Sequence, residues 1–221
     1  MDTILVPTAA ELSVVGRAVS RAANRSRVVV SRLGVGPEAS ARYTHHAGAS
    51  PGDRLALVGW GGGLRPDLVA GATVVASACL DGEGRSVGCE VLALRGALTG
   101  PTLTVSSPLL TVSAKTRAGI ESGALAVEME AFPLALWAAE RGVRFYHVRV
   151  ILDALGEPLP DLDALLDQSG SLTRGWLRRL LARPSAIPGV VRLARRTREV
   201  SPALSEAAYS ICAAWQRSGP A

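Results

Sequence analysis

The stretch GALAVEMEAFPLALWAAERGVRFYHVRVILD, residues 123–153, decides the fold, because it holds a helix-like segment between two strand-like apolar runs. Pro133 is tolerated only in the first turn of a helix, since it lacks an N–H group, and Gly142 is a natural helix stop. Together they predict a helix over 130–141. The run 143–153 is expected to be a strand that returns beside the strand before the helix, which makes a right-handed βαβ unit.

Outward from this unit, short apolar runs rich in β-branched residues alternate with helix-like stretches. Such alternation is typical of a largely parallel sheet that is covered by helices on both faces. The sequence therefore predicts an α/β fold: a single three-layer domain with a central, mostly parallel mixed sheet flanked by helices. The other runs expected to be strands are 3–8, 27–36, 54–64, 72–80, 90–96 and 102–108.

The composition fits one globular domain. The chain has 221 residues, of which 48% are hydrophobic, and a net charge of +5 that is nearly all arginine. Either recognition of phosphate and carboxylate groups or mere genome composition explains this arginine usage. Three cysteines without a CxxC pair argue for a reducing compartment and against a zinc site. We expect a cytoplasmic protein, because the N-terminus lacks a signal-peptide pattern and Gly and Pro interrupt the uncharged run 96–114.

Polar or glycine-rich residues follow several of the expected strands where each one ends. In open α/β sheets, ligands bind outside the carboxyl ends of the strands. We therefore expect one site at this edge of the sheet. The residues placed there are Glu11, Gly61, Gly62, Gly63, Ser106, Ser107, Glu130 and Asp153.

Three motifs in this order resemble the signature blocks of the nucleoside phosphorylase and nucleosidase superfamily: LVGWGGGLRPDLVAGATVVAS (57–77), AVEMEA (126–131) and VRVILDAL (148–155). The segment ILVPTAAEL also resembles the family's first strand and places Glu11 as its catalytic glutamate. The superfamily includes purine and uridine phosphorylases and methylthioadenosine/S-adenosylhomocysteine nucleosidase. The resemblance implies cleavage of the N-glycosidic bond of a purine nucleoside, by phosphate or by water, without a cofactor, in a homodimer or larger homo-oligomer.

The residue types suit this reaction. Asp153 can protonate or hydrogen-bond the purine N7, which lowers the cost of negative charge on the leaving base. Glu130 can accept hydrogen bonds from the ribose hydroxyls beside a developing oxocarbenium ion, with Met129 against the sugar. Glu11 is expected to orient a water or a ribose hydroxyl. Glu128 and Arg149 are expected to support the site by capping or by a buried ion pair, because unpaired buried charges are costly.

A nucleophile-binding loop is expected beside these residues. Its glycines allow close backbone approach, and their N–H groups are expected to cradle phosphate or water. The residues of this loop are Gly61, Gly62, Gly63, Ser106 and Ser107, with Arg32 and Arg65 as further candidate phosphate ligands. His45 and His46 are expected to decorate a loop, and no metal site is expected.

Each role has a structural alternative. Glu130 and Glu128 also suit a solvated helix N-terminus, Asp153 an N-cap or turn, Glu11 an exposed helix position, and the glycine run a tight turn. The chain also departs from the family pattern: Trp60 replaces a small residue, Leu152 replaces the serine before Asp153, and Ala72 replaces an aspartate. A catalytically degenerate nucleoside-binding or scaffold protein therefore stays open as the alternative function.

The C-terminal part carries a basic pattern of its own. We expect residues 1–170 to form the α/β domain and residues 171–221 to form a basic helical extension packed on it. No acidic residue occurs from Gln168 to Arg198, where arginines and apolar residues alternate at helical spacing around a break at ARPSAIPG. This suits either an anionic membrane surface or a helix pair packed on the domain, whereas nucleic-acid binding is not expected. Residues 177–199 resemble the tail of hopanoid-associated phosphorylases, which implies adenosylhopane as the substrate.

Overall fold

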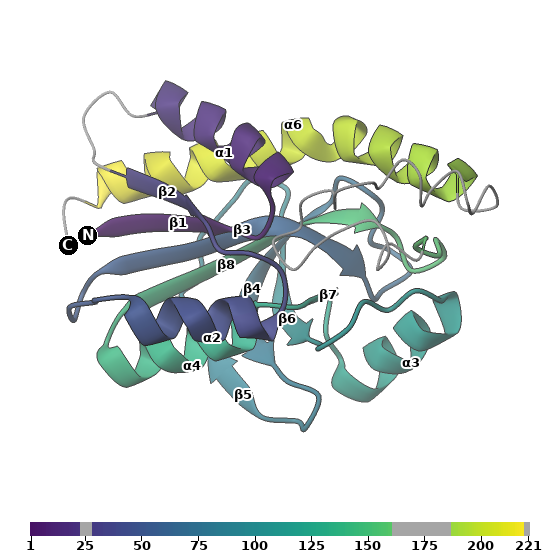
Figure 1. The fold of residues 1–221 in the computed structure, drawn as a ribbon, viewed down its shortest axis with the longest axis horizontal. Helices are drawn as coiled ribbons and strands as arrows, with labels where there is room; N and C mark the ends of the chain where they lie inside the picture. Colours follow the sequence, from purple (N-terminus) through teal and green to yellow (C-terminus); the bar gives the residue numbers. More distant parts are fainter. Residues whose placement is uncertain (23–27, 161–186, 219–221) are drawn as a thin grey trace.

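The computed structural model describes residues 1–22, 28–160 and 187–218. Within these residues the chain forms one mixed sheet with helices on both faces (Figure 1). The strands are β1 (Asp2–Val6), β2 (Val28–Arg32), β3 (Arg54–Gly63), β4 (Thr73–Leu80), β5 (Ser86–Gly88), β6 (Leu98–Thr104), β7 (Ala126–Glu128) and β8 (Arg144–Asp153). The helices are α1 (Ala9–Ala22), α2 (Pro37–His46), α3 (Val112–Ser122), α4 (Ala131–Arg141) and α6 (Ile187–Arg217).

The sheet closes on itself around its longest strands. Strand β3 pairs along its length with β8, β8 pairs with β4, and β4 connects through β6 and β7 back to the end of β3. Strands β1 and β2 continue the parallel part of the sheet from β3. Parallel pairs predominate, so the predicted α/β class with a mostly parallel mixed sheet is confirmed.

The predicted βαβ unit is wrong in its pairing. Helix α4 occupies the predicted span, with Gly142 in the left-handed conformation at its end. However, β7 and β8 do not pair with each other: both pair with β3, β7 antiparallel and β8 parallel. The long apolar β8 pairs with β3, which has the same length, so the short β7 pairs only with the last residues of β3.

Other local predictions also need correction. The apolar run 90–96 is not a strand, and the strand at this place is the short β5, which forms a hairpin with β4. His45 and His46 lie in the last turn of α2 rather than in a loop. Helices α2 and α3 were not predicted, although Thr111 and Gly123 frame α3 as its N-cap and its left-handed C-cap.

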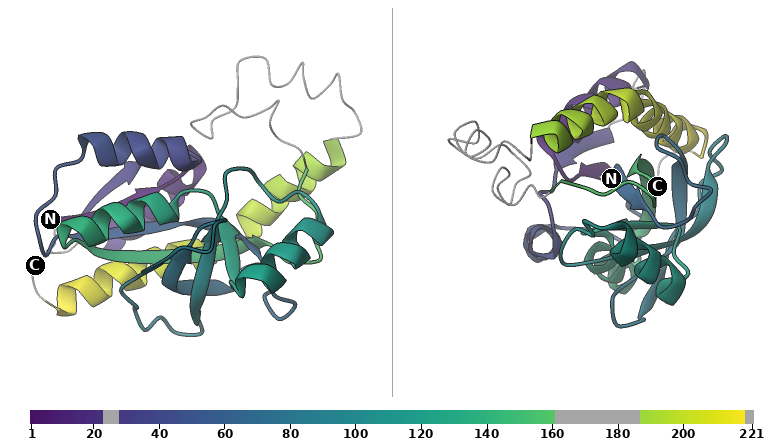
Figure 2. Two further views of the ribbon diagram at one scale, coloured as in Figure 1. Left: turned by 90° about the horizontal axis from the view of Figure 1, so that it is seen from below. Right: turned by 90° about the vertical axis from the view of Figure 1, so that its right-hand side faces the viewer.

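Two apolar clusters fill the space between the sheet and the helices. Helices α1 and α6 cover one face and α2 and α4 the other, as the two views of Figure 2 show. The second half of α6 contributes buried side chains from Val200 to Trp215 to the larger cluster. The predicted boundary between residues 170 and 171 lies outside the described residues and stays a prediction. In the described ranges, no helix combines the length and apolarity that crossing a membrane requires.

Candidate active site

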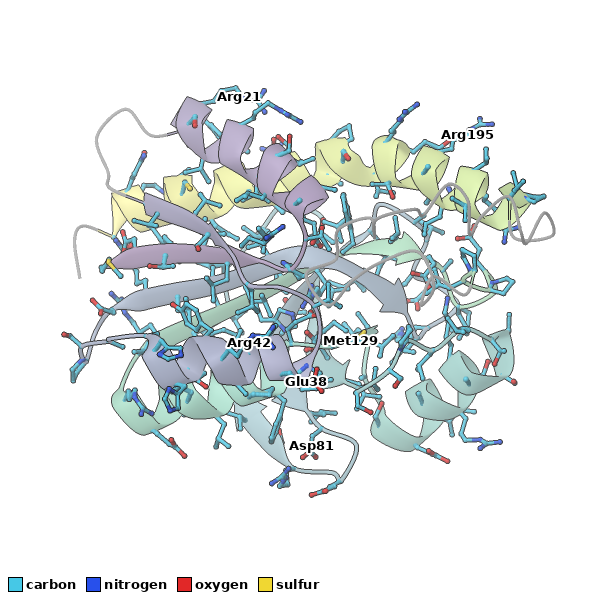
Figure 3. The ribbon with its side chains drawn as sticks, viewed as in Figure 1. Arg21, Glu38, Arg42, Asp81, Met129 and Arg195 are labelled. Atoms are coloured by element: carbon cyan, nitrogen blue, oxygen red, sulfur yellow. The ribbon has the colours of Figure 1, made fainter. Side chains whose placement is uncertain are left out.

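A pocket of about 250 Å³ lies where β1, β3, β7 and β8 end. This is the position at which α/β sheets bind ligands. Its charged lining residues are Glu11, Lys115, Glu128, Glu130, Arg149 and Asp153, and most of the remaining lining is apolar. Met129 belongs to that lining, and Figure 3 shows it near the middle of the molecule, between α2 and α3. The pocket thus brings together most of the predicted site residues.

Glu11 is fixed by a capping box at the start of α1. Its Oε2 accepts hydrogen bonds from the Thr8 N–H at 2.7 Å and from the Thr8 hydroxyl at 2.6 Å, and that hydroxyl accepts from the Glu11 N–H at 3.3 Å. Oε1 accepts from the Trp60 N–H at 2.7 Å. Burial raises the pKa of Glu11, against the opposing effects of Thr8 and Arg149. Glu11 is therefore a buried wall of the pocket and not an exposed helix residue.

Arg149 joins the two glutamates of the AVEME motif. Its Nη2 donates to Glu128 Oε2 at 2.6 Å and to Glu130 Oε2 at 2.8 Å, while Nη1 donates to the Trp60 carbonyl at 3.1 Å. Glu128 Oε2 also accepts the N–H groups of Glu130 and Ala131, both at 2.8 Å, at the start of α4. Glu128 thus caps the helix and pairs with the arginine at once.

Glu130 has a more open set of partners. Among the residues that the structure describes, its carboxylate has one further donor besides Arg149: the Gly36 N–H donates to Oε1 at 2.9 Å. Each carboxylate oxygen can accept about two hydrogen bonds, so each keeps capacity for a ligand hydroxyl. Burial raises the pKa of Glu130 to about 7, with Arg149 lowering it and Glu128 raising it.

His147 is a neighbour of Arg149 that helps to orient its guanidinium. Arg149 Nε donates to His147 Nε2 at 2.8 Å, and an arginine has no acceptor, so Nε2 carries the lone pair and Nδ1 the proton. Nδ1 lies 3.1 Å from Thr102 Oγ1 and 3.5 Å from Cys79 Sγ. Burial and the neighbouring Arg149 lower the pKa of His147 well below its usual value, which keeps the imidazole neutral.

Asp153 ends β8 and forms a buried ion pair with Lys115 of α3. Burial raises the pKa of Asp153 to about 6, and Lys115 limits that rise. A carboxyl group with this pKa can hold or release a proton near neutral pH, as a general acid must. The position therefore suits proton transfer to a ligand in the pocket.

The glycines predicted for the nucleophile-binding loop, Gly61, Gly62 and Gly63, lie in strand β3 rather than in a loop. A Cβ added to Gly62 would lie 3.0 Å from Val127 Cγ1 and 3.1 Å from Asp153 Oδ2, and one added to Gly59 would lie 2.6 Å from Glu11 Oε1. The glycines therefore let β7 and the charged side chains approach the strand. Gly61 and Gly62 line the pocket, and Trp60 borders it while packing against the core cluster beneath α1 and α6.

Some predicted residues are not brought to the pocket. Gly63 pairs with Ala126 and does not line the pocket. Beside β6, the lining residues are Val105, Pro108 and Leu109. The remaining polar candidates are exposed and do not belong to the pocket lining: Ser106, Ser107, Arg32 and Arg65. Arg65 pairs with Asp67 at the surface.

Three features of the site escaped the sequence interpretation. The capping box was readable as T-x-x-E at residues 8–11. Lys115 carried a signal as the chain's one lysine among 24 basic residues, but its partner Asp153 is 38 residues away. His147 sits two positions before Arg149 on a strand, which places both side chains on one face.

No metal-binding cluster is found in the part of the chain that the structure describes, where no three His, Cys, Asp or Glu side chains converge in a suitable way. The pocket instead offers three carboxyl groups of raised pKa: Glu130, Asp153 and Glu11, the last in the first turn of α1. Such a set can hold hydroxyl groups, donate one proton and orient one water molecule.

Part of the chain matches a known protein family. The family model described as "Phosphorylase superfamily" matches residues 95–182. A search of curated protein sequences finds no significant match.

Solved structures match the fold over nearly the whole chain. A Chlamydia trachomatis MTAN variant bound to MTA has a TM-score of 0.64 at 15% identity, covering 97% of this chain and 99% of its own. Futalosine hydrolase of Helicobacter pylori has a TM-score of 0.60 at 15% identity, covering 81% of this chain and 96% of its own. A 5′-methylthioadenosine/S-adenosylhomocysteine nucleosidase from Helicobacter pylori has a TM-score of 0.58 at 14% identity, covering 90% and 99%. The chain thus shares the fold of these solved structures and carries a phosphorylase-superfamily match over residues 95–182, a range that includes the motifs AVEMEA and VRVILDAL.

Proposed function

We propose that this protein is a nucleosidase that hydrolyses the N-glycosidic bond of an adenine nucleoside. The proposal is carried by one observation: Glu11, Glu130 and Asp153 come from three separate elements and line the same pocket. The nucleosidase fold and the phosphorylase-superfamily match support the reaction class.

The charges of the pocket favour water over phosphate as the nucleophile. Its described lining holds four carboxyl groups, on Glu11, Glu128, Glu130 and Asp153, against two cations. Every nitrogen of Arg149 and the ammonium of Lys115 already donate to protein acceptors. The carboxylates would repel a phosphate dianion more than the two cations could attract it, whereas a neutral water needs only an acceptor such as Glu11.

The reaction then follows from three roles. Protonated Asp153 gives its proton to N7 of the base, so the C1′–N9 electron pair leaves on a neutral purine. Ionised Glu130 holds the ribose hydroxyls and stabilises the positive charge that develops on the sugar. A water molecule attacks C1′ and gives its proton to Glu11, which yields the free base and the free sugar.

The outer lining of the pocket supports an apolar 5′ substituent. Val105, Leu109, Leu159 and Leu193 lie there, and Leu193 belongs to α6. Apolar walls of this kind favour a ligand that loses apolar surface to them. Together with the resemblance of the tail to hopanoid-associated phosphorylases, this supports adenosylhopane as the substrate of the enzyme.

The test is adenine release by the purified protein, with and without phosphate. Adenosylhopane, methylthioadenosine, adenosine and inosine are offered in parallel, and free base is measured by chromatography. We expect adenine without added phosphate and no sugar phosphate with it. A strict need for phosphate would contradict hydrolysis, and tight adenine binding in a calorimeter without turnover would favour the nucleoside-binding alternative.

The matched variant for this assay is Asp153→Asn, which keeps the shape of the side chain but cannot supply a proton. Loss of general acid catalysis predicts a fall in kcat of about 10²- to 10⁴-fold. Far-UV and near-UV circular dichroism checks that the fold is kept. Turnover equal to that of the unchanged protein would remove Asp153 from the mechanism.

We also propose a homo-oligomer, as the family resemblance implies. Light scattering on the purified protein measures its mass, and a dimer or larger assembly is expected. A mass of 22.9 kDa, that of one chain, would contradict this.

A further inference from the structure

Lys115 is a buried lysine that the proposed reaction leaves without a role. It is the chain's one lysine, and it is 0% exposed at the pocket wall. Charged side chains of this kind are almost never fully buried unless they are paired. A chain that uses arginine elsewhere therefore keeps a lysine at the one place where a compact ammonium with three divergent donors fits.

The three donors of Lys115 surround the end of β8. Nζ donates to Asp153 Oδ2, to the Ala154 carbonyl at 3.0 Å and to the Glu157 carbonyl at 2.7 Å. Among the described residues, Lys115 is the one side chain that donates to the Asp153 carboxylate, and the preceding residue, Leu152, offers no donor. The ammonium thus fixes the carboxylate and the turn that follows it.

The docking of α3 brings Lys115 to this position. Gly119 lies one helical turn after Lys115 on the same face of α3. A Cβ added to Gly119 would lie 2.5 Å from the Leu64 carbonyl oxygen, so only glycine lets the helix pack this closely against the end of β3. The close packing of α3 at Gly119 therefore also brings the Lys115 side chain within reach of Asp153.

We propose that Lys115 is the positioning residue of Asp153: its ammonium holds the carboxyl at the pocket wall and sets the pH at which that carboxyl carries a proton. The catalytic consequence rests on the proposed function, in which this proton passes to the leaving base. Lys115 itself touches Asp153 and two carbonyls and has no direct part in bond breaking.

Other charges near Asp153 act in known directions. Glu157, from the turn after β8, raises the pKa of Asp153, whereas Lys115 from α3 lowers it. Arg196 of α6 pairs with Glu157 and so moderates its effect. Glu11, Glu128, Glu130 and Arg149 line the same pocket, with Arg149 bonded to both glutamates of the AVEME motif. Replacing Lys115 and replacing Glu157 should therefore move the titration of Asp153 in opposite directions.

The experiment measures this titration directly. Protein labelled with ¹³C at the aspartate carboxyl carbons is titrated by NMR, and the Asp153 signal is assigned by its absence in Asp153→Asn. The midpoint is expected near pH 6 in the unchanged protein. It should rise by more than about one unit in Lys115→Met, which keeps the length of the side chain, and fall in Glu157→Gln. The alkaline limb of kcat/KM for adenine release should move with it.

A second measurement needs no variant that has to fold. With ¹⁵N at the lysine side chain, the unchanged protein gives a single Nζ signal, because Lys115 is its only lysine. That signal should inflect at the Asp153 midpoint. An Nζ signal without this inflection, or an unmoved Asp153 midpoint in folded Lys115→Met, would overturn the proposal.

The two proposals fail in different ways. A midpoint that moves while the alkaline limb of kcat/KM stays in place would overturn the catalytic consequence proposed for the contact between Lys115 and Asp153. Absence of adenine release by the unchanged protein, with the NMR shifts as expected, would overturn the proposed function and leave the coupling of Lys115 to Asp153 intact.

Discussion

Glu128 and Glu130 lie two residues apart, yet their carboxylates take different kinds of partner. Glu128 accepts two backbone N–H groups, the Arg149 guanidinium and the Thr104 hydroxyl, which fills its acceptor capacity. From the described residues, Glu130 accepts hydrogen bonds only from Arg149 and the Gly36 N–H. Because a buried carboxylate with unused acceptors is costly, Glu130 is the one that a hydroxyl-bearing ligand would stabilise.

This difference predicts a pH-dependent contribution of Glu130 to stability. Burial raises its pKa from 4.5 to about 7, so the folded protein keeps a proton that the unfolded chain releases in this interval. The free energy of unfolding contributed by Glu130 therefore falls as the pH rises from about 4.5 to about 7. In Glu130→Gln this fall should disappear, a change on the order of 1–3 kcal/mol between pH 5 and pH 8.

Urea unfolding of both proteins at several pH values measures the difference. His147 acts in the opposite direction, because its lowered pKa makes the folded state bind fewer protons than the unfolded chain. It is present in both proteins and cancels in the comparison, as does Asp153. Parallel stability curves for the two proteins would show that Glu130 is ionised throughout this range.

At the scale of elements, glycine decides how closely the pieces of the site approach. The glycines of β3 make room for β7, Glu11 and Asp153, and Gly119 makes room for the end of β3 under α3. These residues have no side chain to add apolar contact, and their contribution is the space that they leave. Helix packing at such places depends on the missing Cβ more than on helix propensity.

Two helical glycines therefore respond to alanine in opposite ways. Gly119→Ala would push its Cβ to 2.5 Å from the Leu64 carbonyl and should destabilise the fold by about 1–3 kcal/mol. It should also weaken nucleoside cleavage, because α3 carries Lys115. Gly16→Ala in α1 is the matched control: it meets nothing within 4 Å, so it should stabilise by about 0.5–1 kcal/mol. Thermal unfolding compares them, and equal effects of both changes would contradict close packing at Gly119.

At the scale of the whole molecule, the sequence predicted the α/β class but not the closure of the sheet, and most of its candidate site residues line the pocket. Periodicity and the motif AVEMEA located Glu130, and VRVILDAL located Asp153, because both lie at strand ends. Pairing partners depend on strand length and on contacts far apart in the chain, so the antiparallel position of β7 was not readable. Lys115 and His147 were missed for the same reason: their roles arise only from partners on other elements.

Helix α6 shows the same contrast between local pattern and tertiary context. Its second half packs Leu204 and Trp215 into the core, where the Trp215 ring lies 5.5 Å from the Tyr146 ring and 5.3 Å from Arg54. Its first half exposes Arg192, Arg195 and Arg198, and it extends beyond α1 (Figure 1). The basic pattern therefore lies on an exposed surface in the first half of α6, before Val200.

The core half of α6 predicts a large loss of stability. Leu204→Ala truncates a fully buried side chain of α6 and should lower the free energy of unfolding by about 2–5 kcal/mol. The matched change Arg195→Gln lies in the exposed half and should cost less than about 0.5 kcal/mol. Urea unfolding measures the loss of stability in both variants, and a small effect of Leu204→Ala would show that α6 is a detachable extension.

The exposed half of α6 leads to the proposal of peripheral contact with an anionic membrane. An arginine near such a surface contributes about 1 kcal/mol, so replacing Arg192, Arg195 and Arg198 by glutamine should weaken binding to phosphatidylglycerol vesicles about 100-fold. Co-sedimentation at low salt measures this, and binding to phosphatidylcholine vesicles should be weak throughout. A variant with glutamine at Arg65, Arg85 and Arg141 has the same net charge but an unchanged α6, and it should bind nearly as well as the original protein. If both triple variants lose binding equally, net charge alone attracts the protein, and the proposed orientation of α6 toward the membrane fails.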